Sequence, residues 1–229
     1  NVLDTTPITP DRVITVHDAI DTDLFSLRQV DRTSARSGFG FTDDLIVIGL
    51  VGRFSPGKGH EELLEAAALL SKKYSNIHFL IVGEASHGEE RYAQKIRTLS
   101  LSLGLEKVTT FSGYRKDIPE VMAALDIFAF PSHAESFGVV LIEAMAMERP
   151  VVSTNCDGVL DIVVDGQTGI YVHPRNATEL ATALSRLIDD AALREQMGKA
   201  GQLRVEELFD QRKQMNTIEE VYYDLLEER

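Results

Sequence analysis

The sequence has little of what several common protein classes require. Its 229 residues include one cysteine, Cys156, which leaves no internal disulfide framework and fits a reducing compartment. No apolar run approaches the roughly 18 residues of a membrane-spanning helix, and no signal-peptide pattern opens the chain. We therefore expect a cytoplasmic protein without a transmembrane segment. Because the chain opens with Asn1 rather than Met, we also expect it to be a piece of a longer protein.

Basic residues are also scarce. The 23 Lys and Arg residues are outnumbered by 36 Asp and Glu residues, which gives a net charge of −13. Nucleic acids and anionic membranes are bound through a surplus of cations, so this balance argues against both partners. It still leaves room for a local basic site that takes one small anion. The 44% of hydrophobic residues are enough for a sizeable core, and the length fits one α/β domain with extended ends.

Strand-like and helix-like segments alternate along most of the chain. Short apolar runs that stop at glycine or a polar residue are typical of strands buried on both faces. They occur at residues 45–52, 76–83, 108–113, 126–132, 150–155 and 169–173, and a further short strand is expected at 13–16. Helical patterns occupy 60–74, 89–104, 117–125 and the stretch after 138, and they dominate the last 55 residues, whereas 31–44 is typical of a loop. This alternation predicts an α/β fold with a parallel sheet and right-handed crossovers.

The loops that follow the strands are the places to look for function. In a parallel α/β sheet, ligands bind outside the carboxyl ends of the strands. The loops there should be 52–59, 83–88, 113–117, 131–138 and 155–158, and most of them contain glycine, where backbone can approach a ligand closely.

The loop GRFSPGKG, at residues 52–59, matches most of a Walker A phosphate loop. Gly52 is followed after four residues by Gly57 and Lys58, between a strand and a helix. The match fails at Gly59, where a Ser or Thr would hold magnesium, and no apolar strand ending in Asp offers a second magnesium ligand. We interpret the loop as an anion site with two cations, Arg53 and Lys58, that requires no metal; a glycine turn with two solvated charges is the alternative.

The stretch SHAESFGVVLIEAMAMERP, at residues 132–150, places one carboxylate, Glu143, in an otherwise apolar helix. If the helix begins near Gly138, the amides of Gly138, Val139 and Val140 are free donors that favour an anion, together with the helix dipole. An unpaired buried carboxylate is costly, so Glu143 must find donors, a cation or an exit to a cleft. Glu135, eight residues earlier, can reach the same cleft.

Two carboxylates beside an anion site suit a ligand that is rich in hydroxyls and carries phosphate, as a nucleotide sugar does. The alternatives are that Glu143 pairs with a cation such as Arg149, and that Glu135 caps the helix.

Three motifs together resemble the donor-binding half of the family-4 retaining glycosyltransferases, which have the GT-B fold. They are VGRFSPGKG, HAESFGVVLIEAMAMERPVVST and DGVLDIVVDGQTGIYV, and Glu135 and Glu143 match the family's E-x7-E motif. The resemblance covers the chain from about residue 13 onward. It implies a Rossmann-like sheet with helices on both faces, the C-terminal half of a GT-B fold, and an enzyme that transfers a hexosyl group from a nucleotide-diphosphate sugar.

The resemblance also implies roles for residues. Arg53 and Lys58 would hold the donor diphosphate and Glu135 would contact the donor sugar, which makes these three the candidate catalytic residues. Glu143 would accept hydrogen bonds from the ribose. The remaining substrate-binding candidates are Gly52, Ser136, Phe137, Gly138, Val139 and Val140, with Tyr114 and Arg115 near the base. No metal or other cofactor is expected.

The family pattern divides the chain into three parts. Residues 1–42 would be the interdomain linker with the first short strand, 43–205 the donor-binding domain, and 206–229 a helix that packs on an N-terminal domain. That second domain, which would carry the acceptor site and any peripheral membrane contact, lies outside this sequence, so this chain alone is expected to lack transferase activity. The sequence departs from the family at Asp18–Ala19, Asp157 and Asp161, which leaves the donor sugar open.

Other candidates are weaker. Cys156 is more typical of packing than of catalysis, and His17, His78, His87 and His173 show no metal-ligand spacing. His133 fits a surface loop. The competing functions are a non-catalytic nucleotide-sugar-binding module and a magnesium-dependent nucleoside-triphosphate hydrolase. A nicotinamide dehydrogenase is disfavoured because no G-x-G-x-x-G follows the first buried strand.

Overall fold

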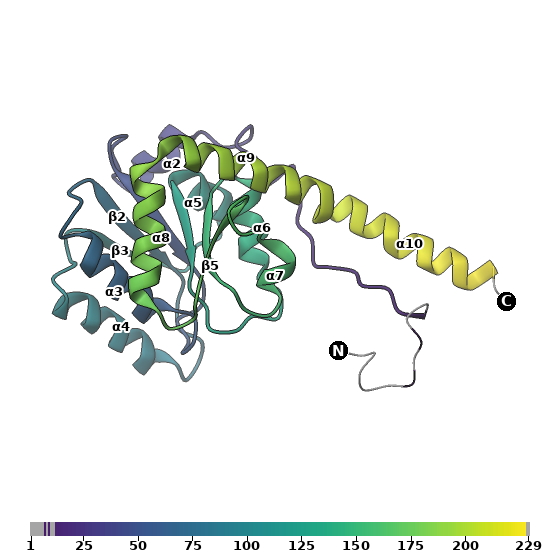
Figure 1. The fold of residues 1–229 in the computed structure, drawn as a ribbon, viewed down its shortest axis with the longest axis horizontal. Helices are drawn as coiled ribbons and strands as arrows, with labels where there is room; N and C mark the ends of the chain where they lie inside the picture. Colours follow the sequence, from purple (N-terminus) through teal and green to yellow (C-terminus); the bar gives the residue numbers. More distant parts are fainter. Residues whose placement is uncertain (1–6, 8, 10–11, 228–229) are drawn as a thin grey trace.

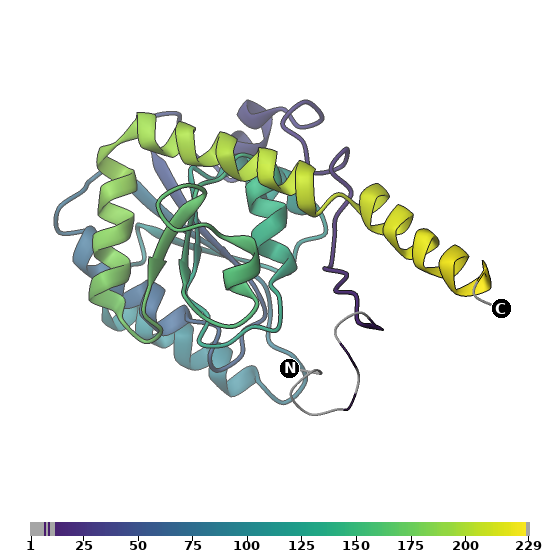
Figure 2. The same cartoon turned by 45° about the vertical axis from the view of Figure 1, so that its right-hand side comes forward.

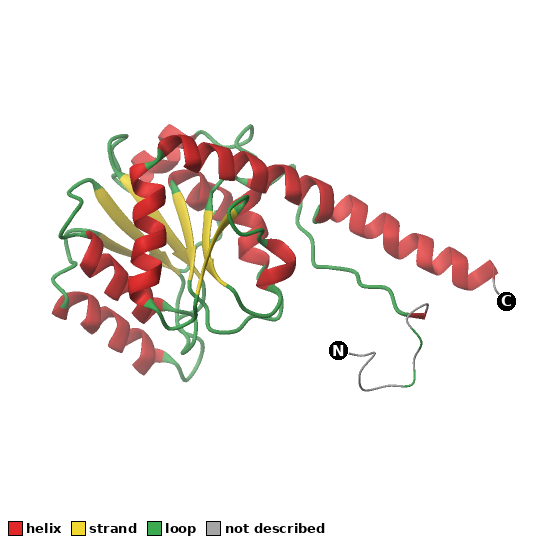
Figure 3. Cartoon of the chain, in the orientation of Figure 1, coloured by secondary structure: helices red, strands yellow, loops and turns green. Residues whose placement is uncertain are grey.

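The computed structural model describes residues 7, 9 and 12–227. The expected linker at residues 1–42 therefore lies partly outside the described residues, as do the last two residues of the expected terminal helix. Figure 1 shows an α/β body from which one long helix projects, and Figure 3 shows the strands as a single layer between helices.

The sheet is parallel throughout, with the strand order β3-β2-β1-β4-β5-β6. Its strands are β1 (Ile46–Val51), β2 (Ile77–Val82), β3 (Thr109–Gly113), β4 (Ile127–Phe130), β5 (Val151–Thr154) and β6 (Gly169–Val172). The order reverses between β1 and β4, which makes their carboxyl ends the expected position of a ligand crevice. The predicted Rossmann-like α/β fold is confirmed.

Helices cover both faces of the sheet. The buried core on one face is formed with α3 (His60–Leu70), α4 (Glu90–Ser102) and α8 (Ala177–Asp189). The core on the other face is formed with α2 (Arg32–Gly38), α5 (Ile118–Ala124), α6 (Val139–Ala146) and α7 (Val159–Ile162). The helix α9 (Ala191–Leu208) contributes Met197 to the first core and Val205 to the second. Apolar side chains on both faces explain why the strands read as continuous apolar runs.

The last helix, α10 (Gln211–Glu227), follows α9 and extends away from the body, with no buried residue among those described (Figures 1 and 2). The same views show the N-terminal segment passing the junction of α9 and α10. Ile20 joins this junction through an isolated parallel bridge to Asp210. No helix in the described part of the chain is long and apolar enough to cross a membrane.

Two local predictions were wrong. The segment at 13–16 is not a strand, and Val13, Ile14 and Val16 are exposed. Four consecutive β-branched residues favour extended backbone, but a strand also needs a neighbour to pair with, and this segment runs outside the sheet. The second error concerns residues 31–44, which were expected to form a loop.

This second segment contains α2. The Asp31 side chain accepts a hydrogen bond from the Thr33 amide, which caps the helix, and the Arg32 guanidinium forms an ion pair with Asp126 (2.7 Å). Arg36, almost fully buried, also pairs with Asp126 (3.0 Å). These tertiary contacts, which local composition does not reveal, offset the low helix propensity of a segment rich in Ser, Thr and Gly.

Candidate functional site

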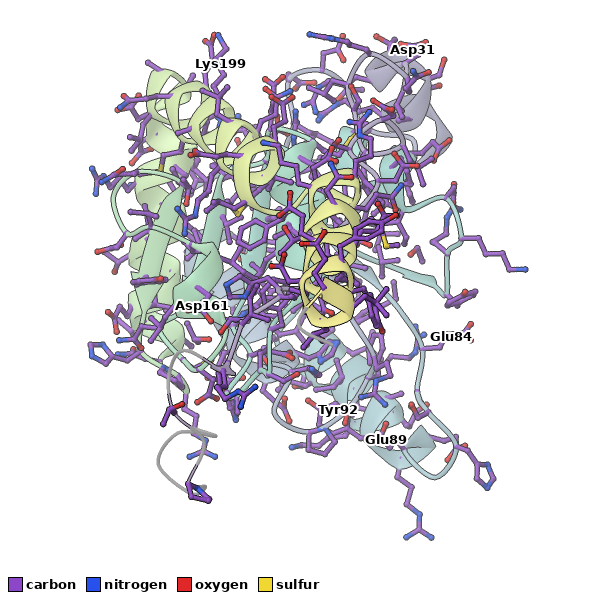
Figure 4. The ribbon with its side chains drawn as sticks, turned by 90° about the vertical axis from the view of Figure 1, so that its right-hand side faces the viewer. Asp31, Glu84, Glu89, Tyr92, Asp161 and Lys199 are labelled. Atoms are coloured by element: carbon purple, nitrogen blue, oxygen red, sulfur yellow. The ribbon has the colours of Figure 1, made fainter. Side chains whose placement is uncertain are left out.

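Two clefts adjoin at the carboxyl ends of the strands. The first has a volume of about 410 Å³ and lies at the reversal between β1 and β4. The second, of about 420 Å³, lies beside β2 and β3, and the two share Val51, Gly52 and Arg53. Figure 4 shows Glu84, which lines the second cleft, on the opposite side of α10 from Asp161 of α7.

The structure brings the predicted site residues together in these clefts. Those lining the first cleft are Gly52, Arg53, Lys58, Glu135, Ser136, Phe137, Gly138, Val139, Val140 and Glu143. Tyr114 and Arg115 line the second cleft. The loops that follow different strands meet because all strands of the sheet point the same way.

The loop after β1 is fixed by its own turn and by the loop after β4. Lys58 donates its amide to the carbonyl of Ser55 (3.2 Å), and His133 donates its amide to the carbonyl of Gly57 (2.7 Å). Gly59 has a left-handed φ of +77°, and a Cβ added there would lie 2.2 Å from the Pro131 carbonyl oxygen. A Ser or Thr cannot occupy this position without moving the loop, which explains the departure from the Walker A pattern and argues against magnesium-dependent hydrolysis.

Lys58 and Glu135 form an ion pair across the first cleft. The buried Ser132 hydroxyl donates a second hydrogen bond to the same carboxylate oxygen, at 2.9 Å. Glu135 therefore does not cap α6, which has no side-chain cap hydrogen bond. Sequence reasoning missed Ser132, although a hydroxyl three residues before a carboxylate in a turn is a recognisable pairing.

Arg53 keeps its guanidinium available at the junction of the two clefts. Among the described residues, the only hydrogen bond of its side chain is a long one from Nη1 to the Ser86 hydroxyl, at 3.5 Å. No described carboxylate forms an ion pair with it. It is therefore a cation that a bound anion could reach.

The start of α6 offers backbone donors that have no partner among the described residues. Gly138 caps the helix with a left-handed φ of +106°, and no side chain satisfies the first turn. Among the described residues, none accepts a hydrogen bond from the amides of Gly138, Val139 or Val140. These free donors, at the positive end of the helix dipole, favour a bound anion.

Glu143 lies one and a half turns into α6 and faces the first cleft. Its carboxylate makes no hydrogen bond or ion pair within the part of the chain that the structure describes, and burial raises the pKa of this carboxyl from 4.5 to about 7. The alternative pairing with Arg149 is wrong. The Arg149 guanidinium points into the protein, where it donates to the carbonyls of Met147 (2.6 Å) and Leu125 (2.5 Å). Glu143 is thus an acceptor held ready for a ligand at the edge of the apolar helix.

Tyr114 and Arg115, the two residues expected near the nucleotide base, differ in how free their side chains are to contact a ligand. Tyr114 is 64% exposed, so its ring is open to a ligand. Arg115 is held by Asp117, to which its Nε donates at 2.8 Å, and its guanidinium lies 5.1 Å from the centre of the Phe39 ring. The hydrogen bond from Arg115 lowers the pKa of Asp117. Arg115 therefore lines the second cleft, but its charge is already neutralised by Asp117.

Some lining residues were not anticipated. Asp18 lines the first cleft, and Glu84 and Ser86 line the second. His133, expected on the surface, is partly buried, and its Nε2 lies 2.7 Å from Glu62. The described residues contain no group of three or more His, Cys, Asp or Glu side chains that could hold a metal ion.

Comparison with known proteins identifies the family. The model of the glycosyl transferases group 1 matches residues 31–204. The capsular polysaccharide biosynthesis glycosyltransferase CapM of Staphylococcus aureus is 34% identical over 190 residues, which cover 81% of this chain and 48% of CapM. The chain thus spans about half the length of the curated relatives it matches.

Solved structures agree. The Anabaena protein Alr3699/HepE, crystallised in complex with UDP and glucose, has a TM-score of 0.87 and 28% identity over 95% of this chain and 58% of its own. The C-terminal domain of LpcC, a glycosyl transferase group 1 family protein from Francisella tularensis, has a TM-score of 0.76 and 30% identity, covering 83% of this chain and 98% of that domain. On the family match, the relatives and the shared fold, this chain belongs to the group 1 glycosyl transferases, and it corresponds to their C-terminal domain.

Proposed function

We propose that this chain is the donor-binding domain of a metal-independent retaining glycosyltransferase of family 4, which transfers a hexosyl group from a nucleotide-diphosphate sugar to an acceptor. One observation carries the proposal. At the reversal of the strand order, cations, free helix amides and two carboxylates converge on one cleft. This combination matches a ligand that carries phosphates at one point and hydroxyls at others.

The diphosphate is assigned to Arg53, Lys58 and the start of α6. Breaking the bond between sugar and phosphate leaves negative charge on the departing diphosphate. The two cations and the amides of residues 138–140 stabilise that charge, which a metal ion would otherwise do. Glycine at 138 lets the backbone approach the phosphate closely.

The hydroxyls are assigned to the carboxylates. Glu143, which has no described protein donor, accepts hydrogen bonds from the ribose. Glu135 lines the same cleft and pairs with Lys58, so we assign it to the donor sugar next to the diphosphate, where it stabilises positive charge that develops on the ring. The base then occupies the second cleft, beside Tyr114.

In the reaction, the bond from the anomeric carbon to the phosphate oxygen breaks and its electron pair stays on the diphosphate. The acceptor hydroxyl attacks the same face of the carbon, and its proton passes to the departing phosphate oxygen, so that the configuration is retained. The acceptor would be held by the other half of the enzyme. This half-length chain alone should bind the donor without transferring the sugar.

The nucleotide that we favour is a uridine diphosphate. The support is the 28% identical Anabaena protein, which binds UDP. The test is calorimetric titration of this chain with UDP, GDP and ADP in the presence of a chelator. We expect UDP to bind and a Glu143→Gln variant to bind it about ten-fold more weakly, because a neutral amide oxygen is a weaker acceptor than a carboxylate.

Glu65→Gln is the matched control, because Glu65 is exposed on α3, away from the cleft. Equal UDP affinity in Glu143→Gln and wild type would contradict the ribose assignment. Binding that appears only with magnesium would contradict metal independence.

A non-catalytic nucleotide-sugar-binding module is the second candidate, favoured by the same half-length coverage. Assay of a longer parent protein that contains this chain separates the two. Sugar transfer supports the enzyme, and donor binding without transfer or donor hydrolysis supports the module.

A further inference from the structure

Three aromatic rings from distant parts of the chain meet at the candidate donor site, where one of them, that of Phe137, belongs to a lining residue. The His17 ring stacks on Phe137, with ring centres 5.6 Å apart and an angle of 21° between the planes. Phe209 meets both rings edge-on, at 5.9 Å from His17 and 5.7 Å from Phe137. The cluster joins the N-terminal segment, the loop before α6 and the junction of α9 and α10.

Backbone hydrogen bonds hold His17 in this position. Ile20 donates its amide to the Phe209 carbonyl (3.0 Å), and Gln211 donates its amide to the Ile20 carbonyl (2.9 Å). The side-chain amide of Gln214 donates to the carbonyl of His17 itself, at 2.6 Å. The N-terminal segment is therefore fastened to the start of α10 at the histidine itself and three residues after it.

The other end of the cluster reaches the donor site. Phe137 is 9% exposed, and the residues on either side of it, Ser136 and Gly138, line the first cleft. The next residue after His17, Asp18, lines the same cleft. The ring of Phe137 thus fixes the backbone that offers its amides at the start of α6.

The imidazole contributes contact area rather than a hydrogen bond. Its nitrogens have no hydrogen-bond partner among the residues that the structure describes, and the ring is only partly buried. An aromatic ring at position 17 is consequently the feature that the packing requires, and a phenyl ring should replace the imidazole.

We propose that His17 is a positioning residue for the donor site: it holds Phe137, and through it the amides of residues 138–140, in place to receive the diphosphate. The ligand part of this inference rests on the proposed function. The positioning of the loop by His17 does not rest on the proposed function, because it can be observed when no ligand is bound.

Amide hydrogen exchange without ligand tests the positioning. Leu141 donates to the Gly138 carbonyl (2.8 Å) and Gly158 to the Glu135 carbonyl (3.1 Å), so both amides report on the loop. In His17→Ala we expect both to exchange about ten-fold faster, the effect of losing two aromatic contacts, while the β1 amides stay protected. His17→Phe should exchange like the wild type. His17→Leu, which keeps most of the volume without a ring, should behave like His17→Ala.

His78→Ala is the matched control, because His78 also contacts an aromatic ring, that of Phe41, but at the amino end of β2. Unchanged exchange at Leu141 and Gly158 in His17→Ala and His17→Leu would overturn the proposal, as would a His17→Phe variant as fast as His17→Ala. UDP titration of the same variants should give about ten-fold weaker binding for Ala and wild-type binding for Phe. A wild type that binds no nucleotide overturns the proposed function, and the exchange data then still decide the role of His17.

Discussion

Lys58 and Glu135 form an ion pair that bridges the loops after β1 and β4. The two strands are neighbours in the sheet at the point where the strand order reverses. In the proposed function, one partner binds the diphosphate and the other the sugar. When the donor binds, its phosphate and sugar must then share or replace the contacts of this ion pair. A substitution at Lys58 should therefore also affect sugar binding, and one at Glu135 should also affect diphosphate binding.

Lys58→Met should weaken UDP binding by about 10- to 100-fold, because a charged hydrogen bond to phosphate contributes about 1.5–3 kcal/mol. The methionine keeps the length and apolar stem of the lysine. Titration calorimetry at low salt gives the difference, and Lys72→Met, at an exposed lysine just after α3, serves as control. A Lys58→Met chain with wild-type affinity would remove Lys58 from the diphosphate site.

Glu135→Gln should have the opposite effect on UDP. Removing the carboxylate charge leaves Lys58 free for phosphate, so UDP affinity should rise about two- to five-fold, the effect of breaking a partly buried ion pair that water still screens. The extra affinity for a UDP-sugar over UDP should fall at the same time, since Glu135 is the proposed sugar contact. Titrations with UDP and with UDP-glucose measure both effects. Parallel changes for the two ligands would speak against a sugar contact.

Glu143 should make both stability and binding depend on pH. The pKa of about 7 in the folded chain exceeds the ordinary 4.5, so between pH 4.5 and 7 the folded chain keeps a proton that the unfolded chain has lost. Stability should therefore fall as the pH rises from 4.5 to 7, by up to about 3 kcal/mol, since each pKa unit is equivalent to about 1.4 kcal/mol. The stability of Glu143→Gln should not decrease in this way, so this variant should be more stable than the wild type at pH 8.

Urea unfolding at pH 4.5 and 8 measures that difference. UDP affinity of the wild type should increase through pH 7, because the ionised carboxylate is the better acceptor for ribose. A pH-independent stability gap between the two chains would show that Glu143 ionises normally.

The site could be predicted from the sequence to the extent that it depends on topology. Parallel strands bring the loops after β1 and β4 to one edge, so Lys58, Glu135 and Glu143 could be expected in one cleft. The ion pair between Lys58 and Glu135 could not, because it depends on side-chain rotamers in two loops. The helix α2 was missed for a related reason: Arg32 and Arg36 stabilise it through Asp126, which is 90 residues or more away.

Gly59 offers a test of the departure from a Walker A loop. Gly59→Ser would complete the Walker A sequence motif, but the added Cβ would clash with the Pro131 carbonyl. We expect no magnesium-dependent ATP hydrolysis and a loss of stability. Gly88→Ala separates the two causes, since Gly88 has a similar φ of +90° with nothing within 4 Å of its added Cβ.

Gly88→Ala should cost about 1–2 kcal/mol from the left-handed backbone alone. Gly59→Ala should cost about 1–3 kcal/mol more, because overpacking adds to the strain. Chemical denaturation gives both values. Equal losses at the two positions would mean that the loop after β1 can move away from Pro131.

Asp210 should control how firmly α10 is attached. Its carboxylate accepts hydrogen bonds from the Thr22 hydroxyl, the Arg212 guanidinium (2.8 Å) and the Arg212 amide (2.8 Å). These bonds, the one from the Arg212 side chain first, lower its pKa well below 3.8. The stabilisation is thus present above pH 3.8 and is lost as the pH falls through the lower folded value.

In Asp210→Asn, the amides of Ile20 and Gln211 should exchange faster than in the wild type at pH 6, because both hydrogen bonds lie at this junction. Asp224→Asn, at an exposed position of α10, is the control. The difference between Asp210→Asn and wild type should shrink in acid as the wild-type carboxylate takes up its proton. Wild-type exchange at Ile20 and Gln211 in Asp210→Asn would instead assign the attachment of α10 to the backbone bridge at Ile20.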